Sequence, residues 1–213
     1  MLSSFILSCF LLAISPGPDN LYIVGITSES GKFSAFSFLL GLLLGCLIHT
    51  TLLAAGLTIL ISENETILSV LKYLGFLYLI YLAIKEYISF KQIDFNKKLE
   101  KKSGFFKYFK IGLIMNLLNP KVLLFFILFF PNFLFSQNYT FHFQILVLGL
   151  IFILISFVVF TVIIYFSDYI KKIISATRSF NIIIKYFNIS ILLFIAFTIL
   201  FSNNIELIVN SLT

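Results

Sequence analysis

Long apolar runs alternate with short polar stretches along this whole sequence. Six such runs follow one another, at about residues 3–27, 33–62, 67–84, 111–130, 141–166 and 186–201. A helix needs about 20 apolar residues to cross the hydrocarbon core of a membrane, so each run predicts one transmembrane helix. Because lipid cannot satisfy unpaired backbone groups, we expect an all-α integral membrane protein with six transmembrane helices.

The composition supports the same class of protein. Of the 213 residues, 60% are hydrophobic and 11% are charged, and the mean hydropathy is +1.08. Soluble domains carry a charge on about a quarter of their residues, so this chain has too few charged residues to be one. Met1 is not followed by a basic leader and a cleavage site, and we expect the first run to be retained as a span. Residues 1–213 are interpreted as a single membrane domain.

The positions of the basic residues predict the orientation. Residues 85–110 form the one substantial hydrophilic stretch and contain eight lysines. With six spans, 13 of the 15 basic residues fall on the side of this loop. The positive-inside rule places that side in the cytoplasm and both termini outside. Orientation and contact with anionic lipid therefore explain the net charge of +6, and no motif indicates a nucleic-acid partner.

Prolines interrupt two of the runs. In the first run, Pro16, Gly17 and Pro18 precede Asp19, which is the only charged residue between positions 2 and 28. In the fourth run, the break is at Pro120. Proline removes a backbone donor and clashes with the preceding turn, so each break leaves polar backbone groups inside the membrane. An intramembrane acid beside a broken helix is typical of a transport site.

The second break carries the opposite charge, because Asn119 and Pro120 are followed by Lys121. At about 1.5 Å per residue, Asp19 and Lys121 lie at a similar depth, roughly 13–17 Å from the cytoplasmic boundary. An unpaired charge is costly at that depth, so we expect an ion pair or a shared hydrated cavity. A simpler role for Asp19 is to cap a helix that restarts near Leu21.

The two breaks occupy corresponding places in the chain. Each lies in the first span of a three-helix half, residues 1–84 and 111–213, and the loop 85–110 joins the halves. Because three is odd, the halves would cross the membrane in opposite directions. This arrangement predicts two inverted repeats, which are found in many secondary transporters.

Several motifs occur in an order that is found in a known family. They are Ser15-Pro16-Gly17-Pro18-Asp19, Gly41-x3-Gly45-x3-His49, Leu71-Lys72-x2-Gly75-x2-Tyr78, and Asn119-Pro120-Lys121 followed by Pro131-Asn132-Phe133. With these motifs the chain resembles the LysE/RhtB-type amino-acid exporters over nearly its whole length. The resemblance implies proton-driven export of amino acids or close derivatives across the bacterial inner membrane. It also implies that either Asp or Asn is accepted at position 19, so the Asp19 carboxylate need not carry the coupling proton.

The candidate site consists of polar residues at the two breaks. We expect four of them to bind the substrate or couple its transport: Asp19, Asn20, Asn119 and Lys121. Three secondary candidates, for each of which helix packing is the simpler role, are His49, Tyr78 and Asn116. The glycine seam of Gly41 and Gly45 fits packing within the chain or across a homodimer. No catalytic residue, metal site or cofactor is expected.

Two other functions remain as alternatives. A divalent-metal or other ion exporter of the same superfamily would need clustered Cys, His or acidic side chains inside the membrane, and the sequence has no such cluster. A membrane thiol-disulfide electron carrier would need Cys9 and Cys46 to meet. We expect these cysteines to be buried small residues instead.

Overall fold

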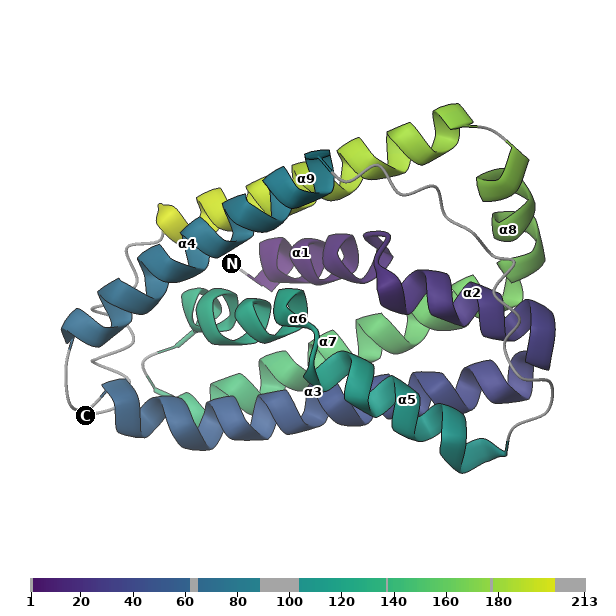
Figure 1. Ribbon diagram of the computed structural model, residues 1–213. Helices are drawn as coiled ribbons and strands as arrows, with labels where there is room; N and C mark the ends of the chain where they lie inside the picture. Colours follow the sequence, from purple (N-terminus) through teal and green to yellow (C-terminus); the bar gives the residue numbers. More distant parts are fainter. Residues whose placement is uncertain (1, 62–64, 89–103, 137, 177, 202–213) are drawn as a thin grey trace.

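The structure of the protein is a computed structural model, drawn in Figure 1. It describes residues 2–61, 65–88, 104–136, 138–176 and 178–201. Within these ranges the regular elements are helices, and none is a strand. The predicted acidic turn around 62–64, the centre of the lysine-rich loop and the tail after 201 lie outside the described residues.

The helices follow the apolar runs closely. In chain order they are α1 (Leu2–Ile14), α2 (Pro18–Ser30), α3 (Lys32–Ile61), α4 (Glu65–Ile88), α5 (Phe105–Leu117), α6 (Pro120–Leu124), the π-helix η1 (Phe125–Phe129), the 3-10 helix η2 (Phe130–Phe133), α7 (Phe141–Tyr165), α8 (Ser167–Ala176) and α9 (Arg178–Leu200).

Two helices are long and apolar enough to cross a membrane by themselves. They are α3, over Lys32–Ala55, and α7. Two pairs of shorter helices are long and apolar enough only when taken together, and each pair is bent: α1 with α2 at an angle of 54°, and α5 with residues 120–127 at 51°. The described residues therefore supply two continuous spans, or up to four if each bent pair is one span. Both predicted helix breaks are confirmed.

One predicted loop is wrong. We expected the segment from 167 to 185 to be a loop because it carries several charges, but α8 and the start of α9 occupy it. The apolar residues Ile170 and Ile173 recur at helical spacing, and Ile170 packs against the core between α2 and α3. The charged residues of α8 alternate with these apolar residues, so α8 is an amphipathic helix. Counting charges alone does not reveal this pattern.

Close backbone contact fixes the position of α5 against α3. A Cβ atom on Gly41 would overlap the carbonyl oxygen of Phe109, and one on Gly112 would overlap the carbonyl oxygen of Phe38. The glycines on both helices therefore let the two backbones touch. The sequence left open whether the glycine seam packs within the chain or across a homodimer, and this contact lies within the chain.

The other helices complete two packed groups, as Figure 1 shows. Helix α3 also packs on α7, which in turn contacts α1, while α2 packs on α3 and α8. Helix α4 pairs with α9, and this pair lies along one side of the molecule. In Figure 1, α1 and α6 lie between the α4–α9 pair and α3, whereas α5 lies along α3.

The ends of five helices meet on one side of the molecule, and several of them carry basic residues. Ser30 at the end of α2 hydrogen-bonds Tyr108 near the start of α5 at 2.7 Å, and Ser28 donates to Asp168 of α8 at 3.2 Å. The Lys32 ammonium lies 4.5 Å from the ring centre of Tyr165 at the end of α7. The basic residues carried by these ends include Lys32, Lys107, Lys110, Lys171 and Lys172.

A block of phenylalanines fills the core beside the second break. The ring pairs Phe125–Phe129 and Phe126–Phe130 lie 4.6 and 4.3 Å apart, and all four side chains are at most 1% exposed. Phe152 of α7 contacts the rings of Phe125 and Phe126. This aromatic block surrounds the π-helix, an element often found near functional sites.

Candidate functional site

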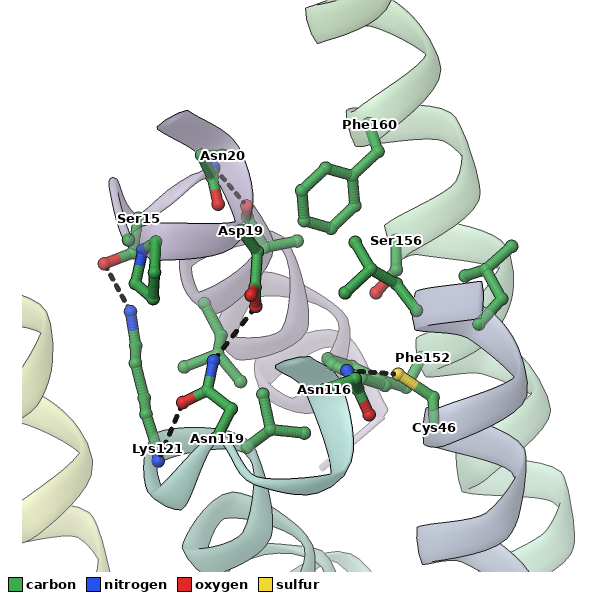
Figure 2. A pocket seen from close by; sticks show the side chains of 17 residues that line it. Ser15, Asp19, Asn20, Cys46, Asn116, Asn119, Lys121, Phe152, Ser156 and Phe160 are labelled. Carbon is green, nitrogen blue, oxygen red and sulfur yellow. Dashed lines mark hydrogen bonds between the residues drawn. The ribbon is translucent and has the colours of Figure 1, made fainter. Parts of the chain in front are cut away.

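A hydrogen bond between two side chains joins the two helix breaks. Asn119 Nδ2 donates to Asp19 Oδ2 at 2.9 Å, as Figure 2 shows. Helix α1 ends at Ile14 and helix α2 begins at Pro18, with Gly17 in extended conformation as its N-cap. Proline is favoured in the first turn because its φ angle is already helical and its missing N–H needs no partner.

The early start of α2 corrects one expectation about Asp19. This residue is not the N-cap of a helix that restarts near Leu21, because the helix already starts at Pro18 and Asp19 lies in its first turn. The carboxylate makes no capping hydrogen bond and is still favourably placed near the positive end of the helix. Asp19 is therefore oriented by Asn119 from the other break.

Asn119 has two roles at once. Its Oδ1 accepts from the backbone N–H of Lys121 at 3.1 Å and so caps α6, while its Nδ2 reaches Asp19. A capping Asn satisfies one of the backbone donors that a helix start leaves free. The Asn119 side chain thus starts the helix after the second break and links the second break to the first.

The Lys121 ammonium does not pair with Asp19. Its Nζ donates to Ser15 Oγ at 2.7 Å and to Asn188 Oδ1 of α9 at 3.4 Å. The Ser15 hydroxyl donates to the same Asn188 oxygen at 2.5 Å. In Figure 2 the Lys121 side chain extends toward Ser15, while the Asp19 carboxylate points toward Asn119. Of the two predicted arrangements, the structure has the shared cavity and not the ion pair.

Two buried oxygen atoms at this site have no hydrogen-bond partner. They are Asp19 Oδ1 and Asn116 Oδ1, and their side chains are 8% and 4% exposed. The Asn116 Nδ2 donates to the sulfur of Cys46 at 3.4 Å. Nearly all buried polar atoms in proteins are satisfied, and an orphan costs about 1–3 kcal/mol. An N–H or O–H donor placed beside either atom would remove this cost.

The two orphan oxygens belong to residues that line one small cavity. Its volume is about 50 Å³, and a buried water needs about 10–15 Å³ on this measure, so the cavity has room for a few water molecules. Its polar wall consists of Ser15, Asp19, Asn20, Asn116, Asn119, Lys121 and Ser156. Its apolar wall includes Leu12, Leu42, Leu43, Val122, Phe152 and Phe160.

The remaining candidates lie at different distances from this cavity. Asn20 lines it and donates to the carbonyl of Ala13 at 3.0 Å, which satisfies an acceptor that the end of α1 leaves free. His49 is buried behind the cavity, where its Nε2 is 3.5 Å from the carbonyl of Asn116. Tyr78 does not line the cavity; it is 37% exposed on α4.

Reasoning from the sequence missed Ser15 and Asn188, which hold the Lys121 ammonium. Ser15 was within the first motif but was assigned no role. Asn188 is the only amide in the sixth run, and an amide inside an apolar span usually bonds to another helix. That rule could have marked Asn188 as a contact without naming its partner.

Comparison with known proteins identifies the family. The sequence model of the LysE type translocators matches residues 10–203, which include both breaks, the cavity and Asn188. The chain belongs to the LysE type translocator family. The resemblance stated from the motifs is thereby confirmed.

Relatives of this LysE type translocator are membrane and efflux proteins. The chain is 31% identical over 158 residues to a homoserine/homoserine lactone efflux protein of Salmonella typhimurium (strain LT2), covering 74% of this chain and 76% of that protein. It is 29% identical over 170 residues to the uncharacterized membrane protein YrhP of Bacillus subtilis (strain 168), covering 76% and 80%. No solved structure matches the chain.

The chemistry available to this translocator is recognition of charge. A carboxylate with one free oxygen and an ammonium held only by neutral partners line the same cavity. Within the described ranges, no group of three or more His, Cys, Asp and Glu side chains is arranged to hold a metal ion. Cys9 and Cys46 are both buried free thiols.

Proposed function

We propose that this protein is a secondary-active exporter of amino acids or close derivatives. It lies in the bacterial inner membrane, is driven by the proton gradient, and has both termini outside. One observation carries the proposal: Asp19 and Lys121 line one cavity without neutralising each other. Each charge can therefore accept the opposite charge of a zwitterion.

The unsatisfied atoms suggest how such a substrate binds. The substrate ammonium donates to Asp19 Oδ1 and Asn116 Oδ1, the two buried acceptors without partners. The substrate carboxylate accepts from the Lys121 ammonium, whose present partners are neutral. Hydrogen bonds to charged groups are about twice as strong as those between neutral groups, so the zwitterion replaces weak contacts with strong ones. Asn119 holds the Asp19 carboxylate in place, and Asn20 keeps the wall of the cavity intact.

The size of the cavity supports transport by alternating access. About 50 Å³ is too small for an amino acid, since a cavity of roughly 150 Å³ is needed for benzene. The helices around the breaks must therefore separate to admit substrate, first on one side of the membrane and then on the other. Proton entry in exchange would drive the substrate outward.

The packing supports two inverted halves, 1–84 and 111–213, with six spans. The two broken helices bend by similar angles, 54° and 51°. Helix α3 in the first half corresponds to α7 in the second, and α4 corresponds to α9. The two helices of each corresponding pair are in contact. Contact between equivalent helices is expected near the axis of a two-fold repeat.

The name of the Salmonella typhimurium relative supports small amino acids and their derivatives as cargo. The proposal is tested by expressing the protein in a sensitive bacterial host and screening for resistance to toxic amino acids, analogues and homoserine lactone. We expect wild type to raise the inhibitory concentration of at least one of these compounds, and Lys121→Ala to lose that effect. Resistance to none of them, or equal resistance from the variant, would contradict the proposal.

A further inference from the structure

Asn188 connects helix α9 to both helix breaks, although it is not part of the cavity wall. Its Oδ1 accepts from Lys121 Nζ at 3.4 Å and from Ser15 Oγ at 2.5 Å. Ser15 is 2% exposed and lies at the first break, while Lys121 lies at the second. The three polar groups thus form one cluster on the α9 side of the cavity, opposite Asn116 and Cys46.

We propose that Asn188 and Ser15 hold the Lys121 ammonium away from Asp19, and that the substrate's carboxylate takes the ammonium over when it binds. Asn188 is then a positioning residue that sets the preference for substrates with a free carboxylate. This inference rests on the proposed function, because it concerns the same cavity.

The physical reason is a competition between acceptors for one ammonium. Asn188 and Ser15 offer neutral oxygens, which bind an ammonium less strongly than a carboxylate does. A substrate carboxylate therefore displaces them. A competing acceptor on the wall of the same cavity is Asp19, whose Oδ1 has no partner. Without the hydrogen bonds to Asn188 and Ser15, the Lys121 ammonium would move to Asp19. The resulting ion pair would occupy both groups that bind the charges of the substrate.

Two substitutions at Asn188 separate this role from a merely structural one. Asn188→Ala releases the ammonium toward Asp19, so every substrate that needs Asp19 binds less well, with or without a carboxylate. Asn188→Asp gives the ammonium a charged partner that the substrate carboxylate cannot easily displace. A substrate without a carboxylate does not compete for that ammonium, and its binding is unchanged.

Homoserine and homoserine lactone are a suitable pair of probes, because both have the α-amino group and only homoserine has the free carboxylate. Initial rates of uptake are measured in everted membrane vesicles for wild type, Asn188→Ala and Asn188→Asp. Ser190→Ala, an exposed position on the same helix, is the matched control. Immunoblots of the vesicles correct each rate for the amount of protein. If Asn188→Ala does not reach the membrane, Ser15→Ala replaces it, because Ser15 makes the other contact to the ammonium.

For Asn188→Asp we expect the KM for homoserine to rise by about fivefold or more, from the stronger hold of a charged acceptor, while the KM for the lactone changes by less than about twofold. For Asn188→Ala we expect both KM values to rise, and for Ser190→Ala neither. Equal effects of Asn188→Asp on both probes, or no effect on either, would overturn the inference and leave the proposed function standing. If wild type transports neither probe, the inference and the proposed function both fail for this substrate class.

Discussion

Asp19 and Asn119 are 100 residues apart in the sequence, and a hydrogen bond of 2.9 Å joins their side chains. Each belongs to a proline-broken helix, so this bond connects the two irregular segments of the predicted transmembrane helices. Non-helical backbone at that depth is tolerated only where protein covers it or water reaches it. Here the breaks cover each other, and the small cavity that they share has room for water.

The double role of Asn119 can be separated by two substitutions. Asn119→Ala removes both the cap of α6 and the hydrogen-bond partner of Asp19. Asn119→Ser keeps an oxygen that can cap α6, but the serine side chain is too short to reach Asp19. We expect both variants to lose most transport. Asn119→Ala should also lose about 0.5–2 kcal/mol of stability, measured as a lower Tm in detergent, and Asn119→Ser much less. Full transport by Asn119→Ser would show that the contact to Asp19 has no function.

Lys121 is predicted to act on the substrate and not to stabilise the fold. Its ammonium is held by neutral partners, and Lys121→Ala removes no ion pair from the site. We expect this variant to reach the membrane at near wild-type abundance and to transport no amino acid. Lys110→Ala, at an exposed position on α5, is the matched control and should retain activity. Wild-type rates in Lys121→Ala would remove this residue from the binding site.

Asp19 is predicted to bind the substrate ammonium without carrying the coupling proton. Asp19→Asn keeps an oxygen acceptor toward the cavity but loses the negative charge, so binding weakens while the proton pathway stays. We expect a KM raised by about tenfold, from the loss of a charge-assisted hydrogen bond, and uptake that still depends on the proton gradient. Uptake that persists but no longer responds to the gradient would identify Asp19 as the proton carrier.

The contact between α3 and α5 is predicted to be intolerant of any side chain. Gly41→Ala would push a Cβ atom into the carbonyl of Phe109, and backbone on both sides prevents relief. We expect a loss of about 1–3 kcal/mol and a clear drop in membrane abundance on immunoblots. Gly104→Ala is the control, because no atom lies within 4 Å of its added Cβ. Equal abundance of the two variants would contradict the observed helix contact.

The sequence allowed the main features of the site to be predicted. Proline disrupts the interior of a helix, so Pro16, Pro18 and Pro120 located both breaks. A charge inside an apolar run has few permitted surroundings, so Asp19 and Lys121 could be expected to form an ion pair or to share a cavity. These inferences depend on local chemistry and on depth in the membrane, both of which follow from position in the chain.

The details that the sequence did not reveal depend on how helices are rotated and packed. Which acceptor holds Lys121 depends on the face that α9 turns toward the breaks, and no local pattern fixes that rotation. The start of α2 was misplaced because Pro18 was counted only as a helix breaker, although proline is also favoured in a first turn. Helix α8 was missed because its charges hid the apolar face that packs on the core.

The central claim is that two opposite charges in one cavity bind a zwitterion for proton-driven export. It is tested most directly by uptake of radiolabelled homoserine into everted membrane vesicles energised with a proton gradient. We predict accumulation above the external concentration in wild-type vesicles, loss of this accumulation with a protonophore, and none in vesicles with Lys121→Ala. Accumulation that is insensitive to the protonophore, or equal in Lys121→Ala and wild type, would contradict the claim.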